Sequence, residues 1–299
     1  MHIGREMKPA PVCAAISQDS PIAYRLATTQ RDLEQAFELV RNEYTRVGLH
    51  ARDRHGLRIT KYHLLPEAKV FVAVALNQFE GGKTAEQVVG TITVIPDGAL
   101  GLPAEAVAGK EIDKLRQARK RAAEFIALAA NDEGTKNRVI LKLFRLAYEY
   151  SRAIGIHTIY ASLTERHIGF YQRFLGLKPL GELAPYEMGN GMPVQVHFLD
   201  VSTQHGQVEY RSRALERDPT WQHFWHHELR GVLAKAIVAR PWTPRLMSSF
   251  LRKSQELQQQ LDSRTIAALG IEYGRYGQSL VNPRPTTDAE VPYREFAFG

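Results

Sequence analysis

The sequence predicts an α/β fold, a mixed β-sheet with helices on its faces, followed by a helical C-terminal extension. Two observations predict it. Between residues 21 and 201, short segments rich in β-branched residues alternate with longer segments whose apolar residues recur at helical spacing. After Val201 this pattern stops, and two segments begin with proline directly after an aspartate or a threonine, as helices often do.

The first half of the sheet region reads as a strand, a helix and a pair of strands. The strand at residues 21–29 ends at a threonine that can cap the following helix. The pair comprises residues 69–77 and 87–97, separated by the turn-rich sequence FEGGKTAE. These two strands are expected to form an antiparallel hairpin.

The rest of the sheet region alternates helices and strands. The expected elements are, in order, a helix at 103–119, a strand at 121–131, a helix at 136–153, a strand at 157–164, a helix at 165–175 and strands at 178–186 and 193–201. The extension is expected to contain helices at 218–237 and 243–262. We therefore expect a disordered segment at 1–20, a sheet-containing domain at 21–202 and a helical extension with a loose tail at 203–299.

Composition indicates a globular protein of a reducing compartment. The chain has 299 residues, 44% of them hydrophobic and 24% charged. Its one cysteine excludes an intramolecular disulfide framework. The first twenty residues lack the apolar run of a signal peptide, and no segment reaches the roughly 18 apolar residues of a membrane span. We expect a cytoplasmic protein without an integral membrane segment.

The formal charge of +7 favours an acidic partner surface. The sequence KLRQARKR at residues 114–121 contains no acid and five cations: Lys114, Arg116, Arg119, Lys120 and Arg121. Such a run is either a solvated face or a docking patch. Since neither zinc-finger spacing nor a glycine-aromatic RNA-binding motif accompanies it, no nucleic-acid partner is expected.

Four sequence segments carry a family resemblance. FYQRFLGL, placed after the fifth strand, resembles the F-Y-x-x-L-G-F segment of the GCN5-related N-acetyltransferase (GNAT) superfamily. RLATTQRDLEQAFELVRNEY, VVGTITVIPD and LPAEAVAGKEIDKLRQARKRAAEFIALA add a likeness to the long-chain N-acyl amino acid synthases, relatives of the acyl-homoserine-lactone synthases. The resemblance spans roughly residues 20–201. It implies a GNAT-like N-acyltransferase that moves a long-chain acyl group from a thioester to the amine of an amino acid.

The resemblance also implies where the thioester binds. In the superfamily the fourth and fifth strands separate, and backbone N–H groups of the fourth bind the thioester carbonyl as it gains negative charge. Ala127, Leu128 and Ala129 occupy that strand here. Small residues there suit either an acyl chain or a tight contact between helix and sheet.

The expected phosphate-binding loop departs from the superfamily pattern. Acetyl-CoA enzymes have a loop similar to Q/R-x-x-G-x-G/A, whereas this chain has NDEGTKNRV with Gly134 alone and two acids before it. An acyl carrier protein offers a single phosphate and an acidic surface, and needs less from the loop. We therefore expect acyl carrier protein rather than acyl-CoA as co-substrate and no tightly bound cofactor, with Lys136, Asn137 and Arg138 near the phosphate and Lys114, Arg116, Arg119 and Lys120 docking the carrier.

Forming an amide from a thioester requires a base for the acceptor ammonium and a proton donor for the departing thiolate. Glu124 lies where both related families often carry an acid, and burial of its strand face would raise its pKa; the other interpretation is an exposed strand end. Tyr171 shares a helical face with Ile168 and Leu175, so its phenol is either a core filler or a proton donor. The resemblance favours the donor.

The acceptor site and the product leave alternatives open. Arg41 and Tyr44 on the first helix are candidates for binding an amino acid's carboxylate, although Arg41 is equally a plausible surface residue. The lactone synthases have a sequence similar to E-x-S-R in the fourth strand, and this chain has alanine at position 127 in place of the arginine. An autoinducer synthase that uses S-adenosylmethionine and a catalytically silent binding module remain the alternatives.

The sequence HFWHHE in the extension contains candidate metal ligands. His223 and His227 are four residues apart, but the pattern H-E-x-x-H is not met because position 231 is glycine. With Trp221 and Trp225 nearby, an aromatic packing face is expected and no metal.

Overall fold

The computed structural model describes residues 22–51, 56–78, 84–118, 120–131, 136–203, 205 and 219–274. Seven strands form one mixed sheet in the order β1-β2-β3-β4-β5-β7-β6. The strands are β1 Ile22–Leu26, β2 Lys69–Gln78, β3 Thr84–Pro96, β4 Ala122–Ala130, β5 Thr158–Thr164, β6 Lys178–Pro185 and β7 Pro193–Asp200. The predicted mixed sheet is confirmed, and β2 and β3 pair antiparallel as predicted. The expectations for the first twenty residues and the tail lie outside the described residues.

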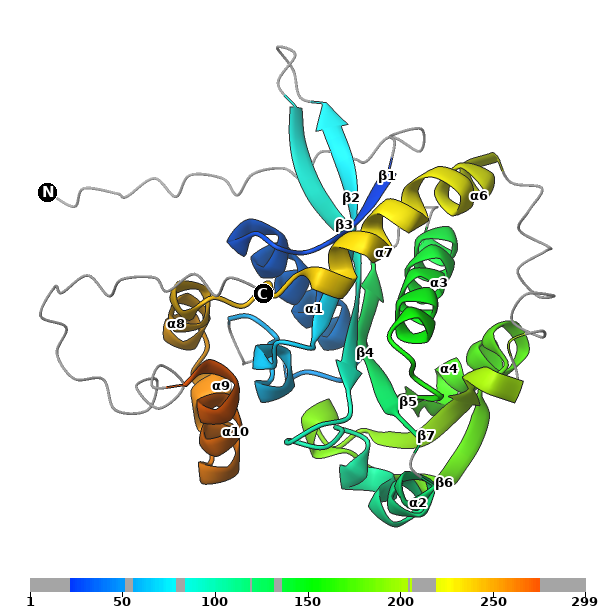
Figure 1. Ribbon diagram of the computed structural model, residues 1–299, viewed down its shortest axis with the longest axis vertical. Helices are drawn as coiled ribbons and strands as arrows, with labels where there is room; N and C mark the ends of the chain where they lie inside the picture. The colour runs from blue at the N-terminus through cyan, green and yellow to red at the C-terminus, as the bar shows by residue number, and fades with distance from the viewer. Residues whose placement is uncertain are drawn as a thin grey trace, which may run out of the picture.

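Helices cover both faces of this sheet (Figure 1). Alternate β2 residues divide between two cores: Phe71, Ala73 and Ala75 pack with α3 (Lys136–Ala153), and the intervening valines pack with α1 (Gln30–Arg46). Because side chains alternate across a strand, α1 and α3 lie on opposite faces. A third core joins α2 (Glu105–Gln117) to the end of the sheet formed by β5, β6 and β7.

The C-terminal extension packs on both faces. On the α3 face are α6 (Pro219–His223), a π-helical turn at Phe224–Glu228 and α7 (Leu229–Val238); on the α1 face are α8 (Pro244–Lys253), α9 (Gln255–Gln259) and α10 (Ser263–Tyr273) (Figure 1). The helix predicted at 243–262 is two helices, because the Ser254 hydroxyl caps α9 by accepting the Leu257 N–H at 3.1 Å. The sequence interpretation missed α10. No helix in the described part of the chain is long and apolar enough to cross a membrane.

The HFWHHE segment packs through its aromatic residues. Phe224 is fully buried, with its ring centroid 5.0 Å from Tyr24 and 5.9 Å from Trp221. The Arg145 guanidinium on α3 lies 4.2 Å from the centroid of Trp225. The predicted aromatic packing face is confirmed. Within the residues that the structure describes, no three histidine, cysteine or acidic side chains cluster as metal ligands would.

Candidate active site

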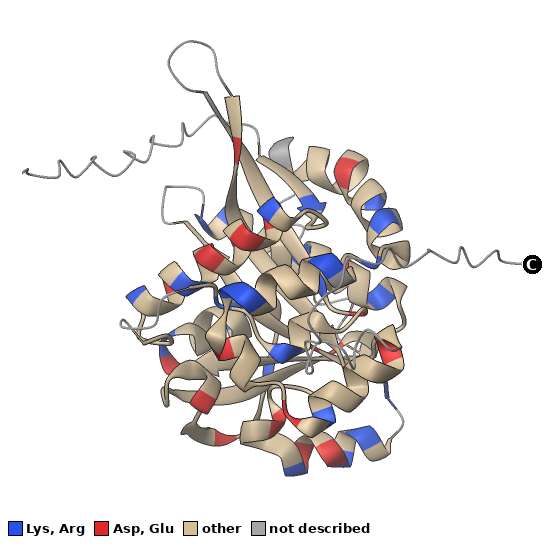
Figure 2. Ribbon diagram, turned by 90° about the vertical axis from the view of Figure 1, so that its left-hand side faces the viewer, with Lys and Arg blue, Asp and Glu red and all other residues tan. Residues whose placement is uncertain are grey.

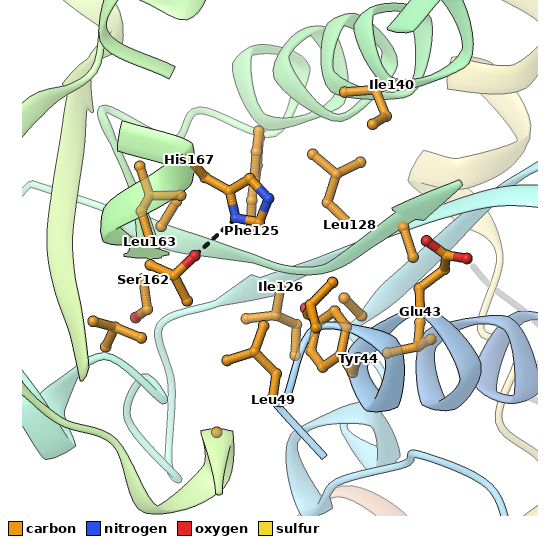
Figure 3. Close-up of a pocket in the computed structure, with 18 of the residues that line it drawn as sticks. Glu43, Tyr44, Leu49, Phe125, Ile126, Leu128, Ile140, Ser162, Leu163 and His167 are labelled. Carbon is orange, nitrogen blue, oxygen red and sulfur yellow. Dashed lines mark hydrogen bonds between the residues drawn. The ribbon is translucent and has the colours of Figure 1, made fainter. Parts of the chain in front are cut away.

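A cavity of about 420 Å³ opens beside the central strands. Its lining comes from α1, β4, β5, α3 and the short helix α4 (Glu165–Phe170) and is mainly apolar. Figure 3 shows Leu128 of β4 between Ile140 of α3 and Tyr44 of α1, with His167 of α4 at one side. A largely apolar cavity with a few polar groups is typical of a small-molecule or acyl-chain site.

The cavity forms where β4 and β5 separate. The two strands pair in parallel only from Ala122 to Glu124, whereas β5 stays paired with β7 as far as Thr164. Beyond Glu124, β4 therefore has no β5 partner for its backbone N–H groups on that side. The separation predicted from the family resemblance is present.

A β-bulge in β4 increases this separation. Thr91 of β3 pairs with Ala129 and Thr93 pairs with Ile126, so Ala127 and Leu128 together oppose a single β3 residue. Ala127 has φ +54°, a left-handed conformation that is uncommon for residues other than glycine. The predicted thioester-binding residues Ala127, Leu128 and Ala129 all line the cavity.

Glu124 lies at the point of separation and faces the cavity. Its side chain is completely buried, and burial is the largest cause that raises its pKa to about 7. Its carboxyl oxygens accept hydrogen bonds from the Ala104 N–H at 2.6 Å and the Ser162 hydroxyl at 3.1 Å, which act in the opposite direction. Glu124 is therefore held in place and can exchange a proton near neutral pH.

Tyr171 also lines the cavity, at the start of a π-helical turn, Tyr171–Leu175, that continues α4. The ring of Phe170 packs edge-on against it, with centroids 5.6 Å apart. Burial raises the pKa of its phenol, so the hydroxyl stays protonated. That hydroxyl has no hydrogen-bond partner among the described residues, which leaves its proton available to a ligand in the cavity.

The mouth of the cavity carries several charged side chains. Of the three predicted phosphate residues, Lys136 and Asn137 line the cavity, and Arg138 is exposed and does not. The Lys136 ammonium lies 3.2 Å from Glu43 of α1, so it joins the two sides of the mouth. Arg46 and Arg166, which the sequence interpretation missed, also line the mouth.

The two predicted acceptor residues have different positions. Tyr44 lines the cavity, and burial raises the pKa of its phenol; the charge of Arg58 and a backbone hydrogen bond from Ala127 partly offset this effect. Arg41 is not among the residues that line the cavity. Its guanidinium instead donates to the Gly56 carbonyl at 2.9 Å and to Asn42 at 2.9 Å.

Three further cavity residues have no pattern that marks them in the sequence: Arg58, His63 and Tyr186. His63 is buried, and burial lowers its pKa to about 3, so the ring is neutral. Its Nδ1 accepts the Thr60 N–H at 3.1 Å. Arg58 and Tyr186 come from segments between the regular elements, where periodicity gives no signal.

The basic run at 114–121 carries less free charge than its sequence suggests. Arg116 forms ion pairs with Asp97, Glu105 and Asp113, and Lys120 lies 3.0 Å from Asp200. Arg119 lies outside the described residues, and none of the described residues of the run lines the cavity. Acidic and basic segments are also interspersed over the face shown in Figure 2. The fold supplies the acids that the local sequence lacks, which weakens the docking interpretation.

The seven-stranded sheet and the separation of β4 and β5 give the chain a GNAT-like fold, with a buried carboxyl group facing the gap between the two strands. A family model for the N-acyl amino acid synthase FeeM matches residues 35–200, and the chain belongs to this family. A search of curated proteins found no match.

Three solved structures illustrate the likeness. FeeM, an N-acyl amino acid synthase from uncultured soil microbes, is 22% identical over 64% of this chain and 96% of its own, with a TM-score of 0.53. BjaI, a CoA-dependent acyl-homoserine lactone synthase solved with SAM and isopentyl-CoA, is 16% identical over 66% of this chain and 90% of its own, with a TM-score of 0.42. An N-acetyltransferase from Staphylococcus aureus Mu50 is 15% identical over 62% of this chain and 100% of its own, with a TM-score of 0.39.

Proposed function

We propose that this N-acyltransferase transfers a long-chain acyl group from acyl carrier protein, in preference to acyl-CoA, to the amine of an amino acid. The observation that carries the proposal is the position of Glu124, a buried carboxyl group with a pKa of about 7 at the point where β4 leaves β5. The apolar lining supports a long acyl chain. The single glycine of the loop after β4 supports a donor with less phosphate than coenzyme A.

The first step is deprotonation of the acceptor. The Glu124 carboxylate takes a proton from the acceptor ammonium, and the neutral amine then attacks the thioester carbonyl carbon. Ser162 and the Ala104 N–H hold the carboxyl group in position for this transfer. A pKa near 7 makes about half of the enzyme competent at neutral pH.

The second step is collapse of the tetrahedral intermediate. Its oxyanion is bound by N–H groups of β4 beyond Glu124, which have no β5 partner. The carbon–sulfur bond then breaks, the Tyr171 hydroxyl donates its proton to the departing thiolate, and the resulting phenolate takes the second proton from the nitrogen of the attacking amine. The products are an N-acyl amino acid and the free thiol of the carrier.

The test is a reconstitution with matched donors. The purified full chain is incubated with one long-chain acyl group on either acyl carrier protein or coenzyme A and with a mixture of the amino acids, and products are identified by mass spectrometry. We expect N-acyl amino acids, formed faster from the carrier. Equal rates from both donors would contradict the carrier preference, and a lactone formed only with S-adenosylmethionine would contradict the amino-acid product.

A further inference from the structure

Arg58 is a buried cation in the cavity. Its side chain is 9% exposed, and the guanidinium carbon lies 5.8 Å from the centroid of the Tyr44 ring. Burial is the largest effect on the pKa of two of the cavity phenols, Tyr44 and Tyr186; beside it, the charge of Glu124 raises both pKa values and the charge of Arg58 lowers them. The guanidinium and the carboxyl group of Glu124 therefore face the same space.

The C-terminal extension holds this guanidinium. Its Nη1 lies 3.1 Å from Oε1 of Glu256 on α9, and its Nη2 donates to the Met188 carbonyl. These two bonds occupy two of the five N–H groups of a guanidinium. No other described residue bonds the Arg58 side chain, so its remaining N–H groups are available to a ligand.

The extension also clamps the segment that carries Arg58 into the cavity. The Lys61 N–H donates to Gln260 at 3.0 Å, and the Lys61 ammonium lies 3.1 Å from Asp262. From α10, the Tyr273 hydroxyl donates to the Leu64 carbonyl at 2.8 Å. Four side chains of the extension thus contact residues 58–64. The extension itself lies outside the region that the family model matches.

We propose that Arg58 binds the carboxylate of the acceptor and that Glu256 of the extension is the residue that positions it. This inference rests on the proposed function. Among the described residues, the other cations that line the cavity are Arg46, Lys136 and Arg166. These three lie at its mouth, where Arg46 and Lys136 both form ion pairs with Glu43. An acceptor with its amine at Glu124 therefore meets one buried cation inside the cavity.

A fixed guanidinium suits this task. Its planar fork binds a carboxylate through two parallel hydrogen bonds, provided that the fork is held in one orientation. Glu256 supplies that orientation by fixing Nη1 from the extension side, and the Tyr44 ring lies beside the guanidinium. The extension is then part of the acceptor site, and acceptors without a carboxylate are disfavoured.

The experiment compares each amino acid with the amine that lacks its carboxylate. In the wild type we expect kcat/KM to be roughly ten- to a hundredfold higher for the amino acid. Arg58→Gln should lower kcat/KM for the amino acid toward that for the plain amine, so that the preference is lost. Glu256→Ala should raise KM for the amino acid about tenfold with little change in kcat, and Glu256→Gln, which keeps the acceptor oxygen, should restore most of it.

Lys253→Gln is the matched control. It removes an ion pair between Lys253 of α8 and Glu34 of α1, which also joins the extension to the domain but does not line the cavity. Its KM should equal that of the wild type. A wild type that acylates plain amines as well as amino acids overturns the inference and leaves N-acyl transfer intact. A wild type that acylates neither overturns both, and equal KM changes in Lys253→Gln and Glu256→Ala would reduce Glu256 to a stabilising contact.

Discussion

The charge of Glu124 is set by opposing effects at one side chain. Complete burial favours the neutral acid, and the hydrogen bonds from Ala104 and Ser162 favour the carboxylate. Burial is the larger effect, so the pKa is raised to about 7 instead of lying near 4.5. A carboxyl group with this pKa is a stronger base near pH 7 than an exposed glutamate would be.

We expect Glu124→Gln to lower kcat/KM roughly a hundredfold at pH 7, because general-base catalysis contributes at about that level. The base form of Glu124 is present above its pKa, so the wild-type rate should rise as the pH passes about 7. The mutant should lack this rise, and its defect should shrink at higher pH, where more of the acceptor amine is already neutral. The measurement is a pH profile of kcat/KM, with circular dichroism to confirm folding. A normal profile for the mutant would remove Glu124 from the mechanism.

Tyr171→Phe should cost less, about tenfold, because a thiol is already a good leaving group. The mutant keeps the ring that packs on Phe170 and loses the unpartnered hydroxyl. A donor with a more acidic thiol needs less proton donation, so the defect should shrink with an aryl thioester. If the defect is the same with both thioesters, Tyr171 acts by shaping the cavity and not as a proton donor.

Single residues differ in how well the sequence predicts them. Glu124 and Tyr171 were found because each lies at a fixed place within a regular element that a family motif marks. Arg58 was missed because it lies in an irregular segment, and its partner Glu256 is almost two hundred residues away. Arg41 lies on the expected helix, but its guanidinium donates a hydrogen bond to the Gly56 carbonyl instead of lining the cavity. The direction of a long side chain depends on its neighbours, which the sequence does not show.

At the scale of elements, β4 and α3 determine the shape of the cavity, and Gly90 of β3 sets how closely α3 approaches the sheet. A Cβ at Gly90 would lie 2.4 Å from Val139 and 3.0 Å from Leu143, both on α3. A Cβ there would require the Val139 side chain or the helix itself to move. Because α3 also carries Lys136 to the mouth, this close contact positions one wall of the site.

We therefore expect Gly90→Ala to destabilise the protein by about 1–3 kcal/mol through overpacking. Gly231→Ala in α7 is the control, since a Cβ there meets no atom within 4 Å. It should be neutral or stabilising by up to about 1 kcal/mol, because alanine favours helix. Urea unfolding of the two variants measures both effects. Equal stability of Gly90→Ala and the wild type would show that α3 can shift freely.

The sequence predicts the order of most elements, because hydrophobic periodicity is a local signal. The bulge at Ala127 was not predicted, since it depends on how β4 aligns with β3. The break at Ser254 was missed because serine within a helical pattern does not by itself show whether its hydroxyl caps a new helix. The π-helical turn at Tyr171 has apolar spacing similar to that of an α-helix.

At the scale of the whole molecule, the extension joins both faces of the sheet. Its first part packs Phe224 and Trp225 on α3, and its second part packs Phe250 and Trp242 beside Phe37 of α1. The cavity thus lies in a domain that is covered on both faces by the extension. Ion pairs also join segments that are distant in the sequence. Arg116 pairs with Asp97 and Lys120 pairs with Asp200, which counting charges along the sequence does not reveal.

The cations at the cavity mouth are better placed than the 114–121 run to meet an acidic carrier. Arg166 is exposed and lines the mouth, and together with Lys136 it lowers the pKa of His167, which burial lowers most. If the phosphopantetheine arm of a carrier enters this mouth, the acidic surface of the carrier comes to lie beside Arg166 and Lys136. Interactions between exposed charges weaken as salt screens them, so their contribution should depend on ionic strength.

We expect Arg166→Glu to raise the apparent KM for acyl carrier protein about tenfold at low salt, with a smaller effect at high salt. Lys120→Glu is the matched control, because it makes the same charge reversal at a residue that does not line the cavity. It should change KM for the carrier little, because Lys120 is paired with Asp200. A small thioester without phosphate or protein should serve both variants as well as the wild type, which separates docking from chemistry. The measurement is initial rate against donor concentration at two salt concentrations. If Lys120→Glu raises the apparent KM for the carrier and Arg166→Glu does not, the carrier docks on the 114–121 run, and its phosphopantetheine arm must reach the cavity from the α2 side.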